Sequence, residues 1–310
     1  MLGNVSLFLF ALLTLWLGAG IIVYSLDKIS KQLEISAFAV SFFILGLLTS
    51  LPELSVGINS ILENRPEIFV GDLIGGSLTL FIFVIPLLAI LSKRITLSHQ
   101  MSTLKLIFSL YVVGLPAILI IDNNLTIPES LLLIFVYFVL FYNMEKRKGI
   151  LDHLKNNILV AKKHNLFEFT KIIAGAFVVF MSSSILVEKT IYFSQVFKIT
   201  PYLISLLVLS LGTNLPEISI ALRSVVSGNK QIAFGNYLGS AATNTLLMGI
   251  LTIFNRKPIF LENHFLLTFL FMATGLFLFY YFTRSKNDIS RNEGVILIFL
   301  YLVFLAVELI

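Results

Sequence analysis

Long apolar segments alternate with short polar connections along almost the whole chain. A helix that crosses a bilayer needs about 20 predominantly apolar residues, and ten segments approach or exceed this length. They cover residues 5–25, 36–61, 67–91, 103–121, 127–144, 168–190, 199–226, 231–254, 263–282 and 292–310. The longest polar connection, residues 146–166, separates five of these segments from the other five. The pattern therefore predicts an all-α integral membrane protein with ten transmembrane helices.

The composition agrees with this pattern and excludes several classes of protein. Hydrophobic residues make up 57% of the chain and charged residues only 13%, whereas a soluble domain carries about 25% charged residues. The chain has 0 cysteines, which excludes disulfides and thiolate metal sites. The histidines show no metal-ligand spacing and fall in or beside polar connections, at His99, His153, His164 and His264.

The positions of the basic residues predict the orientation of the chain. The net charge is +5, but the lysines and arginines lie between apolar segments, which indicates membrane topology rather than a nucleic-acid partner. With the N-terminus outside, the inner connections hold 17 of the 22 basic residues and the outer ones hold 5. We therefore predict that both termini lie outside the cell membrane, and that residues 146–166 form a cytoplasmic basic linker on the bilayer surface.

Two halves of five spans must enter the membrane from opposite sides, because five is an odd number. Residues 41–80 align without a gap with residues 205–244, at a constant offset of 164, and 13 of the 40 positions are identical. The shared residues include proline, glutamate, threonine and paired glycines, which apolar character alone does not explain. We therefore predict two inverted-topology repeats of five helices, residues 1–145 and 167–310, an arrangement found in secondary transporters.

Two short strings inside apolar segments carry the candidate chemistry. Residues 49–53 read Thr-Ser-Leu-Pro-Glu, and residues 213–217 read Thr-Asn-Leu-Pro-Glu. A proline inside a helix removes a backbone hydrogen bond and breaks the helix. A carboxylate at bilayer depth is costly and usually serves ion handling. Because the costly pair occurs twice, we predict one midplane site built from two halves.

The residues of these strings and of the following helices suit a hard cation. Calcium takes six to eight oxygen ligands and mixes carboxylates with carbonyls. Two carboxylates can neutralise one divalent ion, two sodium ions or two protons, which is a basis for exchange. The candidate ligands for the cation are Glu53, Glu217, Thr49, Thr213, Asn244, Ser50, Asn214, Ser240, Ser77 and Asp72.

At these residues the chain resembles the sodium/calcium exchanger membrane-region family of the calcium/cation antiporter superfamily. That family carries a Gly-Thr/Asn-Ser-Leu-Pro-Glu type of string, followed on the next helix by Gly-Asn-x-x-Gly-Ser-Asn-x-x-Asn/Asp. Residues 48–53 and 212–217 match the first string, and residues 235–244 match the second. The resemblance implies that the two glutamates are the central ligands, with Asn244 and the threonines beside them. It also implies that the first and sixth helices slide as a mobile pair over a rigid eight-helix core.

The first half departs from the family pattern at two positions. Leu80 stands where the family expects a polar side chain that faces the ion, and Gly76 stands where serine is usual. Asp72 lies eight residues before Leu80, about 12 Å along a helix, so it does not replace that ligand directly. Asp72 is either a pathway residue near the outer mouth or a solvated acid at a helix start. These departures leave the ion ratio and the ion choice open.

The resulting prediction is a secondary-active cation antiporter, with sodium/calcium exchange as the first choice. The alternatives are a calcium/proton antiporter that uses the same glutamates and a family member with altered ion choice. An intramembrane enzyme is disfavoured because residues 182–184, three serines, have no base nearby in the sequence. A non-transporting scaffold is disfavoured because it gains nothing from two buried carboxylates. We expect no cofactor, the transported cations and the lipid bilayer as partners, no protein partner, and a monomer.

Overall fold

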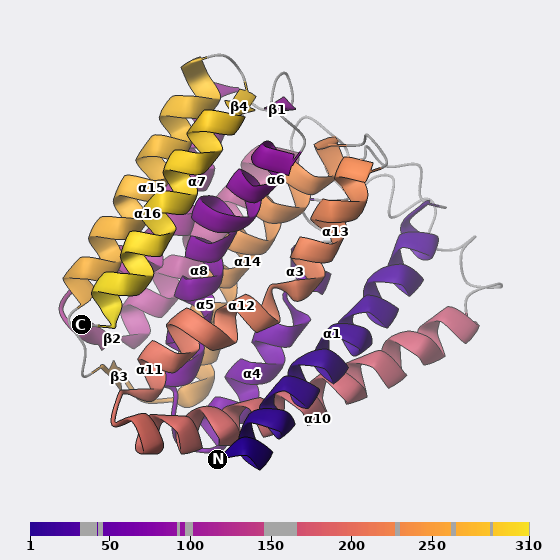
Figure 1. Cartoon of the computed structure of the whole chain (residues 1–310), viewed down its shortest axis with the longest axis vertical. Helices are drawn as coiled ribbons and strands as arrows, with labels where there is room; N and C mark the ends of the chain where they lie inside the picture. The colour runs from indigo at the N-terminus through magenta and orange to yellow at the C-terminus, as the bar shows by residue number, and fades with distance from the viewer. Residues whose placement is uncertain are drawn as a thin grey trace.

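The computed structural model describes residues 1–31, 42, 46–91, 94–96, 102–145, 166–226, 230–261, 265–285 and 288–309. Over these residues the chain forms a bundle of helices with two very short β pairs (Figure 1). The basic linker up to residue 165, the beginning of the span predicted at 36–61 and all four histidines lie outside the described residues.

Helices occupy most of both halves of the chain. The first half contains α1 (Leu2–Lys31), α3 (Gly46–Thr49), α4 (Leu51–Leu62), α5 (Glu67–Thr79), the π-helical turn η2 (Leu80–Val84), α6 (Ile85–Leu91), α7 (Thr103–Leu119) and α8 (Ile127–Glu145). The second half contains α10 (Leu166–Phe197), α11 (Pro201–Ile204), the π-helical turn η3 (Ser205–Leu209), α12 (Ser210–Thr213), α13 (Leu215–Val226), α14 (Lys230–Asn255), α15 (Phe265–Ser285) and α16 (Arg291–Glu308).

The described helices overlap all ten ranges that the apolar pattern predicts as spans. Seven helical segments of the described chain are long and apolar enough to cross a membrane, and α7 is apolar but shorter. Ten transmembrane helices therefore stay a prediction. The helices α1 and α10 run beyond the predicted ranges 5–25 and 168–190, because their polar ends continue the helix past the apolar stretch.

Two antiparallel β pairs were not part of the all-α prediction. Strand β1 (Arg94–Thr96) pairs with β4 (Asp288–Ser290), and β2 (Asn124–Leu125) pairs with β3 (Ile259–Phe260). The two pairs lie at opposite ends of the molecule (Figure 1). Strands of two or three residues carry no readable alternation of polar and apolar side chains, which explains why the sequence did not predict them. Each pair joins a connection of the first half to a connection of the second.

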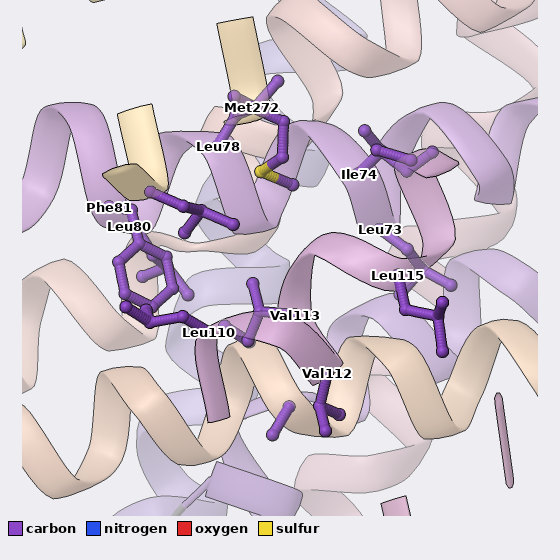
Figure 2. Packing of buried hydrophobic residues seen from close by; sticks show 14 of the residues in the cluster. Leu73, Ile74, Leu78, Leu80, Phe81, Leu110, Val112, Val113, Leu115 and Met272 are labelled. Atoms are coloured by element: carbon purple, nitrogen blue, oxygen red, sulfur yellow. The ribbon is translucent and has the colours of Figure 1, made fainter. Parts of the chain in front are cut away.

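The centre of the bundle is formed by α14 and by the rod made of α5, η2 and α6. About 83% of the most apolar stretch of each is buried, compared with 33% for α1 and for α10. The main apolar cluster extends from this rod to α7, where Figure 2 shows Leu115 near Leu73, and Leu110 near Leu80 and Phe81. Helices that are apolar on all sides suit the interior of a membrane protein, so these two rods are where a protected site can be built.

The helices α1 and α10 lie against each other along their length and cross the outer face of the bundle (Figure 1). Their backbones approach closely, since a Cβ added to Gly18 would lie 3.1 Å from the carbonyl oxygen of Gly175. The hydroxyls of Thr14 and Ser182 are hydrogen-bonded across the pair at 2.9 Å. Ser182, one of the three serines at residues 182–184, therefore packs inside this helix pair.

Glycines let the helices on either side of the site touch backbone to backbone. A Cβ on Gly75 of α5 would lie closer than 3.0 Å to the carbonyl oxygen of Leu206 in η3. A Cβ on Gly239 of α14 would lie equally close to the carbonyl oxygen of Phe42, and one on Gly46 would lie 2.6 Å from the carbonyl carbon of Gly239. Small residues at crossings allow such approach in membrane bundles.

Replacing Gly239 with alanine should therefore destabilise the bundle. The added Cβ meets backbone atoms of Phe42 rather than a flexible side chain, so the two backbones must separate, at a cost of about 1–3 kcal/mol. The midpoint of thermal unfolding in detergent, measured at one scan rate, should fall. The control is Gly20→Ala in α1, where no atom lies within 4 Å of the added Cβ. Equal midpoints for both variants would contradict the close crossing.

Candidate functional site

Each of the two strings with proline contains a helix interruption that is one residue wide. Ser50 separates α3 from α4, with φ −83° and ψ 8°, and Asn214 separates α12 from α13, with φ −80° and ψ 6°. The following helices begin at Leu51 and Leu215, so each proline occupies the second residue of a new helix. Proline is tolerated in the first turn of a helix because the N–H groups there have no intrahelical partner.

One backbone carbonyl organises each interruption. The carbonyl oxygen of Gly46 accepts the N–H of Ser50 at 3.3 Å, the hydroxyl of Ser50 at 2.9 Å and the hydroxyl of Thr49 at 3.3 Å. The carbonyl oxygen of Ser210 accepts the backbone N–H of Asn214 at 3.3 Å, the side-chain amide of Asn214 at 2.7 Å and the hydroxyl of Thr213 at 3.3 Å. The side chains at each break are thus anchored to a backbone carbonyl on one side.

The two glutamates stand one turn after the interruptions and are buried. Glu53 of α4 is 1% exposed, and Glu217 of α13 is 0% exposed. Thr213 lies within hydrogen-bonding reach of Glu53, and Thr49 lies within reach of Glu217, so each half supplies a hydroxyl to the glutamate of the other half. The Oε2 atom of each glutamate is buried without a hydrogen-bond partner among the described residues.

The helix α14 presents a polar stripe to the first interruption. Asn236, Ser240 and Asn244 are four residues apart and therefore share one face of the helix. The hydroxyl of Thr49 lies 2.7 Å from that of Ser240 and donates to Asn236 Oδ1 at 3.5 Å. Ser240 also donates to Glu217 Oε1 at 3.2 Å. The sequence reasoning missed Asn236, although its place four residues before Ser240 was a sufficient signal.

Asn244 closes the stripe against α5. Its amide nitrogen donates to the carbonyl oxygen of Leu73 at 3.3 Å and to the hydroxyl of Ser77 at 3.4 Å. Its Oδ1 atom has no partner among the described residues. Because the amide nitrogen is held by protein acceptors, the oxygen is the atom that remains for a ligand.

The corresponding face of the rod made of α5 and η2 carries Asp72, Gly76 and Leu80. Asp72 is 0% exposed, and its Oδ1 accepts a hydrogen bond from Thr213 at 3.0 Å. The option that Asp72 is a solvated acid at a helix start is therefore wrong, because the neighbouring helices cover it. At Gly76, an added Cβ would lie 2.8 Å from the amide nitrogen of Asn214 and 3.2 Å from that of Asn244, so glycine makes room for both amides.

Leu80 belongs to the apolar core. It is 0% exposed and lies in the cluster that also holds Phe81 and Leu110 (Figure 2). The π-helical turn η2 begins at Leu80 and ends just before Pro86, which has no N–H to donate to the carbonyl of Ile82. A π turn absorbs such a missing bond. The matching part of α14 has no proline and stays α-helical.

All ten residues predicted to form the site are buried, with at most 3% of each exposed. In the part of the chain that the structure describes, no lysine or arginine pairs with Glu53, Asp72 or Glu217, and the ion pairs involve residues such as Arg65 and Glu67. No three acidic or histidine side chains of the described ranges are close enough to hold a metal ion alone. A cation here would therefore need hydroxyl and amide oxygens as well as carboxylates.

The comparisons with known proteins place this site in context. A model of the sodium/calcium exchanger protein family matches residues 3–144 and 168–310. The sodium/calcium exchanger MaX1 of Methanosarcina acetivorans is 25% identical over 349 aligned residues, which cover 98% of each chain. The fold is similar to that of the sodium-calcium exchanger NCX_Mj, with a TM-score of 0.68, 20% identity and coverage of 98% and 97%. It is also similar to the H+/Ca2+ exchanger CAX, with a TM-score of 0.75, 16% identity and coverage of 99% and 86%.

Replacing Leu80 with asparagine should destabilise the protein, although asparagine is the residue at the matching position of α14. The amide would enter an apolar cluster without a partner, at a cost of about 1–3 kcal/mol. Leu80→Met, which conserves volume and polarity, is the control and should change the thermal midpoint in detergent much less. If the Leu80→Asn variant is as stable as the parent protein, the position faces a polar site and not the core.

Proposed function

This chain belongs to the sodium/calcium exchanger protein family, and on that premise we propose that it is a secondary-active antiporter that exchanges calcium for sodium at one midplane site. The family resemblance predicted from the two strings is thereby confirmed. Proteins of this family are ion exchangers, which makes the chain an integral membrane transporter for cations rather than an enzyme. The observation that supports the site is the pair of buried glutamates, each with an unpartnered oxygen.

The two glutamates would serve as the central calcium ligands. An uncompensated carboxylate in a low-dielectric interior is costly, and removing the partner of a buried charge costs about 3–5 kcal/mol. A divalent cation between Glu53 and Glu217 would neutralise both charges. Calcium prefers six to eight oxygens, and neutral oxygens lie beside the glutamates in Thr49, Thr213 and Ser240. Further oxygens come from Ser50, Ser77, Asn214 and Asn244.

The same pair supports exchange. A site that carries two negative charges is expensive to move across the membrane interior when it is empty. Either one calcium ion or two monovalent ions would balance the charges of Glu53 and Glu217, so the loaded forms can interconvert and the empty form cannot. Alternating access of one load at a time then couples the two gradients.

A second candidate function is calcium/proton exchange with the same glutamates. It is favoured by Leu80, which lies in the core where the matching residue of α14 is the amide Asn244. The first half therefore supplies fewer neutral oxygens, and a sodium ion needs such oxygens whereas a proton does not. The absence of an amide at Leu80 also supports the alternative that this family member prefers a different ion.

The inverted repeat is supported by the bounds of the helices. The pairs α3 and α12, and α4 and α13, are offset by 164 residues at both ends, and α1 and α10 are offset by 164 at their first residue. The same offset relates the first residues of α8 and α16. These correspondences support a repeat that reaches beyond residues 41–80 into the proposed halves, 1–145 and 167–310.

The β pairs and the helix caps support the repeat independently. Ile95 pairs with Ile289 in one sheet, and the residues offset from them by 164, Ile259 and Leu125, pair in the other. The capping box of Thr126 with Glu129 recurs 164 residues later in Ser290 with Glu293, and all four hydrogen bonds measure 2.7 Å. Equivalent sheets lie at opposite ends of the molecule (Figure 1), which supports the proposal that the halves run in opposite directions.

The pair of α1 and α10 would be the mobile part of the transporter. It is as exposed as α8 and more exposed than α5 and α14, and α1 covers the site directly, because Leu12 fills the space beside Gly212 next to Thr213. Polar links to the rest of the bundle include Trp16 to Ser219 at 2.7 Å. A helix pair that slides should make few hydrogen bonds to the core, and the described hydrogen bonds between the pair and the core are few.

The predicted orientation can be tested with single cysteines, since the chain has 0 of its own. Asp122 and Lys257 are exposed beside β2 and β3, and Arg284 is exposed near β4. With both termini outside, a membrane-impermeant maleimide added to intact cells should label Asp122→Cys and Lys257→Cys. It should label Arg284→Cys only after the membrane is opened. The reverse pattern would overturn the orientation while leaving the ion site untested by this result.

The function is tested by flux in proteoliposomes. Calcium uptake driven by an opposing sodium gradient should fall by about 100-fold or more in Glu53→Gln and in Glu217→Gln, because each removes about 3 kcal/mol of charge neutralisation. The matched control is Glu63→Gln, an exposed glutamate just after α4, which should retain uptake. Undiminished uptake in both site variants would refute the site. A pH gradient in place of the sodium gradient decides between the two counter-ions.

A further inference from the structure

The two halves of the site differ in charge along matching helix faces. On α14 the face carries Asn236, Ser240 and Asn244, and on the rod of α5 and η2 the matching positions carry Asp72, Gly76 and Leu80. The first-half face therefore lacks one hydroxyl and two amides and has one carboxylate instead. The site as a whole holds three acidic side chains and not the two that a symmetric design would hold.

Asp72 occupies the place of an amide that has a defined role in the other half. Thr49 donates to Asn236 Oδ1 at 3.5 Å, and its repeat partner Thr213 donates to Asp72 Oδ1 at 3.0 Å. Thr49 also contacts the hydroxyl of Ser240 at 2.7 Å, whereas Gly76 offers no such group to Thr213. The shorter bond to Asp72 fits a charged acceptor.

The second oxygen of Asp72 is available to a ligand. Asp72 is 0% exposed, and its Oδ2 has no hydrogen-bond partner among the described residues. No lysine or arginine of the described ranges neutralises it. The residue after Thr213, Asn214, also has a buried amide oxygen without a partner in this part of the chain. A buried carboxylate in such surroundings requires a cation or another source of positive charge.

Charge balance indicates which cation this is. Glu53, Asp72 and Glu217 lie close enough for their charges to repel one another. One divalent ion at the two glutamates compensates two of the three charges and leaves one. A carboxylate with a hydroxyl is a hard, all-oxygen donor set, which suits an alkali cation rather than a soft metal.

We propose that Asp72 and the hydroxyl of Thr213 form a subsite for a monovalent alkali cation, sodium in the first place, next to the pair of glutamates and without an equivalent in the other half. The proposal rests on the proposed function in one respect: the proposed function supplies the divalent ion that binds between the two glutamates. The cation compensates the third charge when the divalent ion is present.

The test is a sodium titration of the purified protein in detergent, at fixed pH, with the rise of the thermal midpoint as the readout. A ligand that binds the folded state raises this midpoint, and the rise grows with the logarithm of the ligand concentration once that concentration exceeds the Kd. In Asp72→Asn the sodium concentration that gives a fixed rise should increase by about tenfold or more, while the calcium concentration that gives the same rise should change little. Asp122→Asn, the same change at an exposed residue, should leave both unchanged.

Two further measurements keep the proposal falsifiable. Thr213→Ser keeps the hydroxyl and should keep the sodium response, whereas Thr213→Val should weaken it in the same direction as Asp72→Asn. The subsite is overturned if sodium raises the thermal midpoint of Asp72→Asn as it does that of the parent protein. It is also overturned if the midpoint of the parent protein changes with pH but not with the sodium concentration. If the parent protein shows no calcium flux in proteoliposomes, the proposed function fails, and the sodium titration still decides the subsite.

Discussion

Buried negative charge without a basic partner is the constraint on which the rest of this structure depends. Glu53, Asp72 and Glu217 are at most 1% exposed, and no lysine or arginine of the described residues pairs with them. A protein cannot hold such groups in an apolar bundle at low cost unless hydrogen bonds and a mobile cation stabilise them. The helix interruptions, the hydroxyls and the close helix crossings all help to stabilise these carboxylates, because each brings oxygen ligands or hydrogen-bond donors close to them.

The backbone supplies the precision that the site needs. Gly46 and Ser210 hold the interruptions through one carbonyl each, and the side chains after the break are fixed by those carbonyls. Glycines at 75 and 239 bring the opposing helices into backbone contact. Ligands that are held by rigid elements keep their positions to within fractions of an ångström, so selectivity for an ion radius becomes possible without a rigid loop.

The sequence predicted the large features, because apolar length, the offset of 164 and the two strings are strong signals. The family and the burial of all ten site residues follow from them. The β pairs could not be predicted, since strands of two or three residues have no period. The partner of Asp72 could not be predicted either, because the contact with Thr213 joins residues that are 141 positions apart. The π turn at Leu80 could not be predicted either, because it depends on how the backbone adjusts to the N–H that Pro86 lacks.

The differences between the halves occur in compensating pairs and not at isolated positions. Asn214 is larger than its repeat partner Ser50, and Gly76, which faces Asn214, is smaller than its partner Ser240. In a close-packed interior, a larger side chain is tolerated best when a neighbouring side chain is smaller. The same logic extends to charge: a half that gives up neutral oxygens at positions 76 and 80 carries an additional carboxylate at position 72. In the proposed site, the two halves would thereby keep a matching geometry while each prefers a different ion.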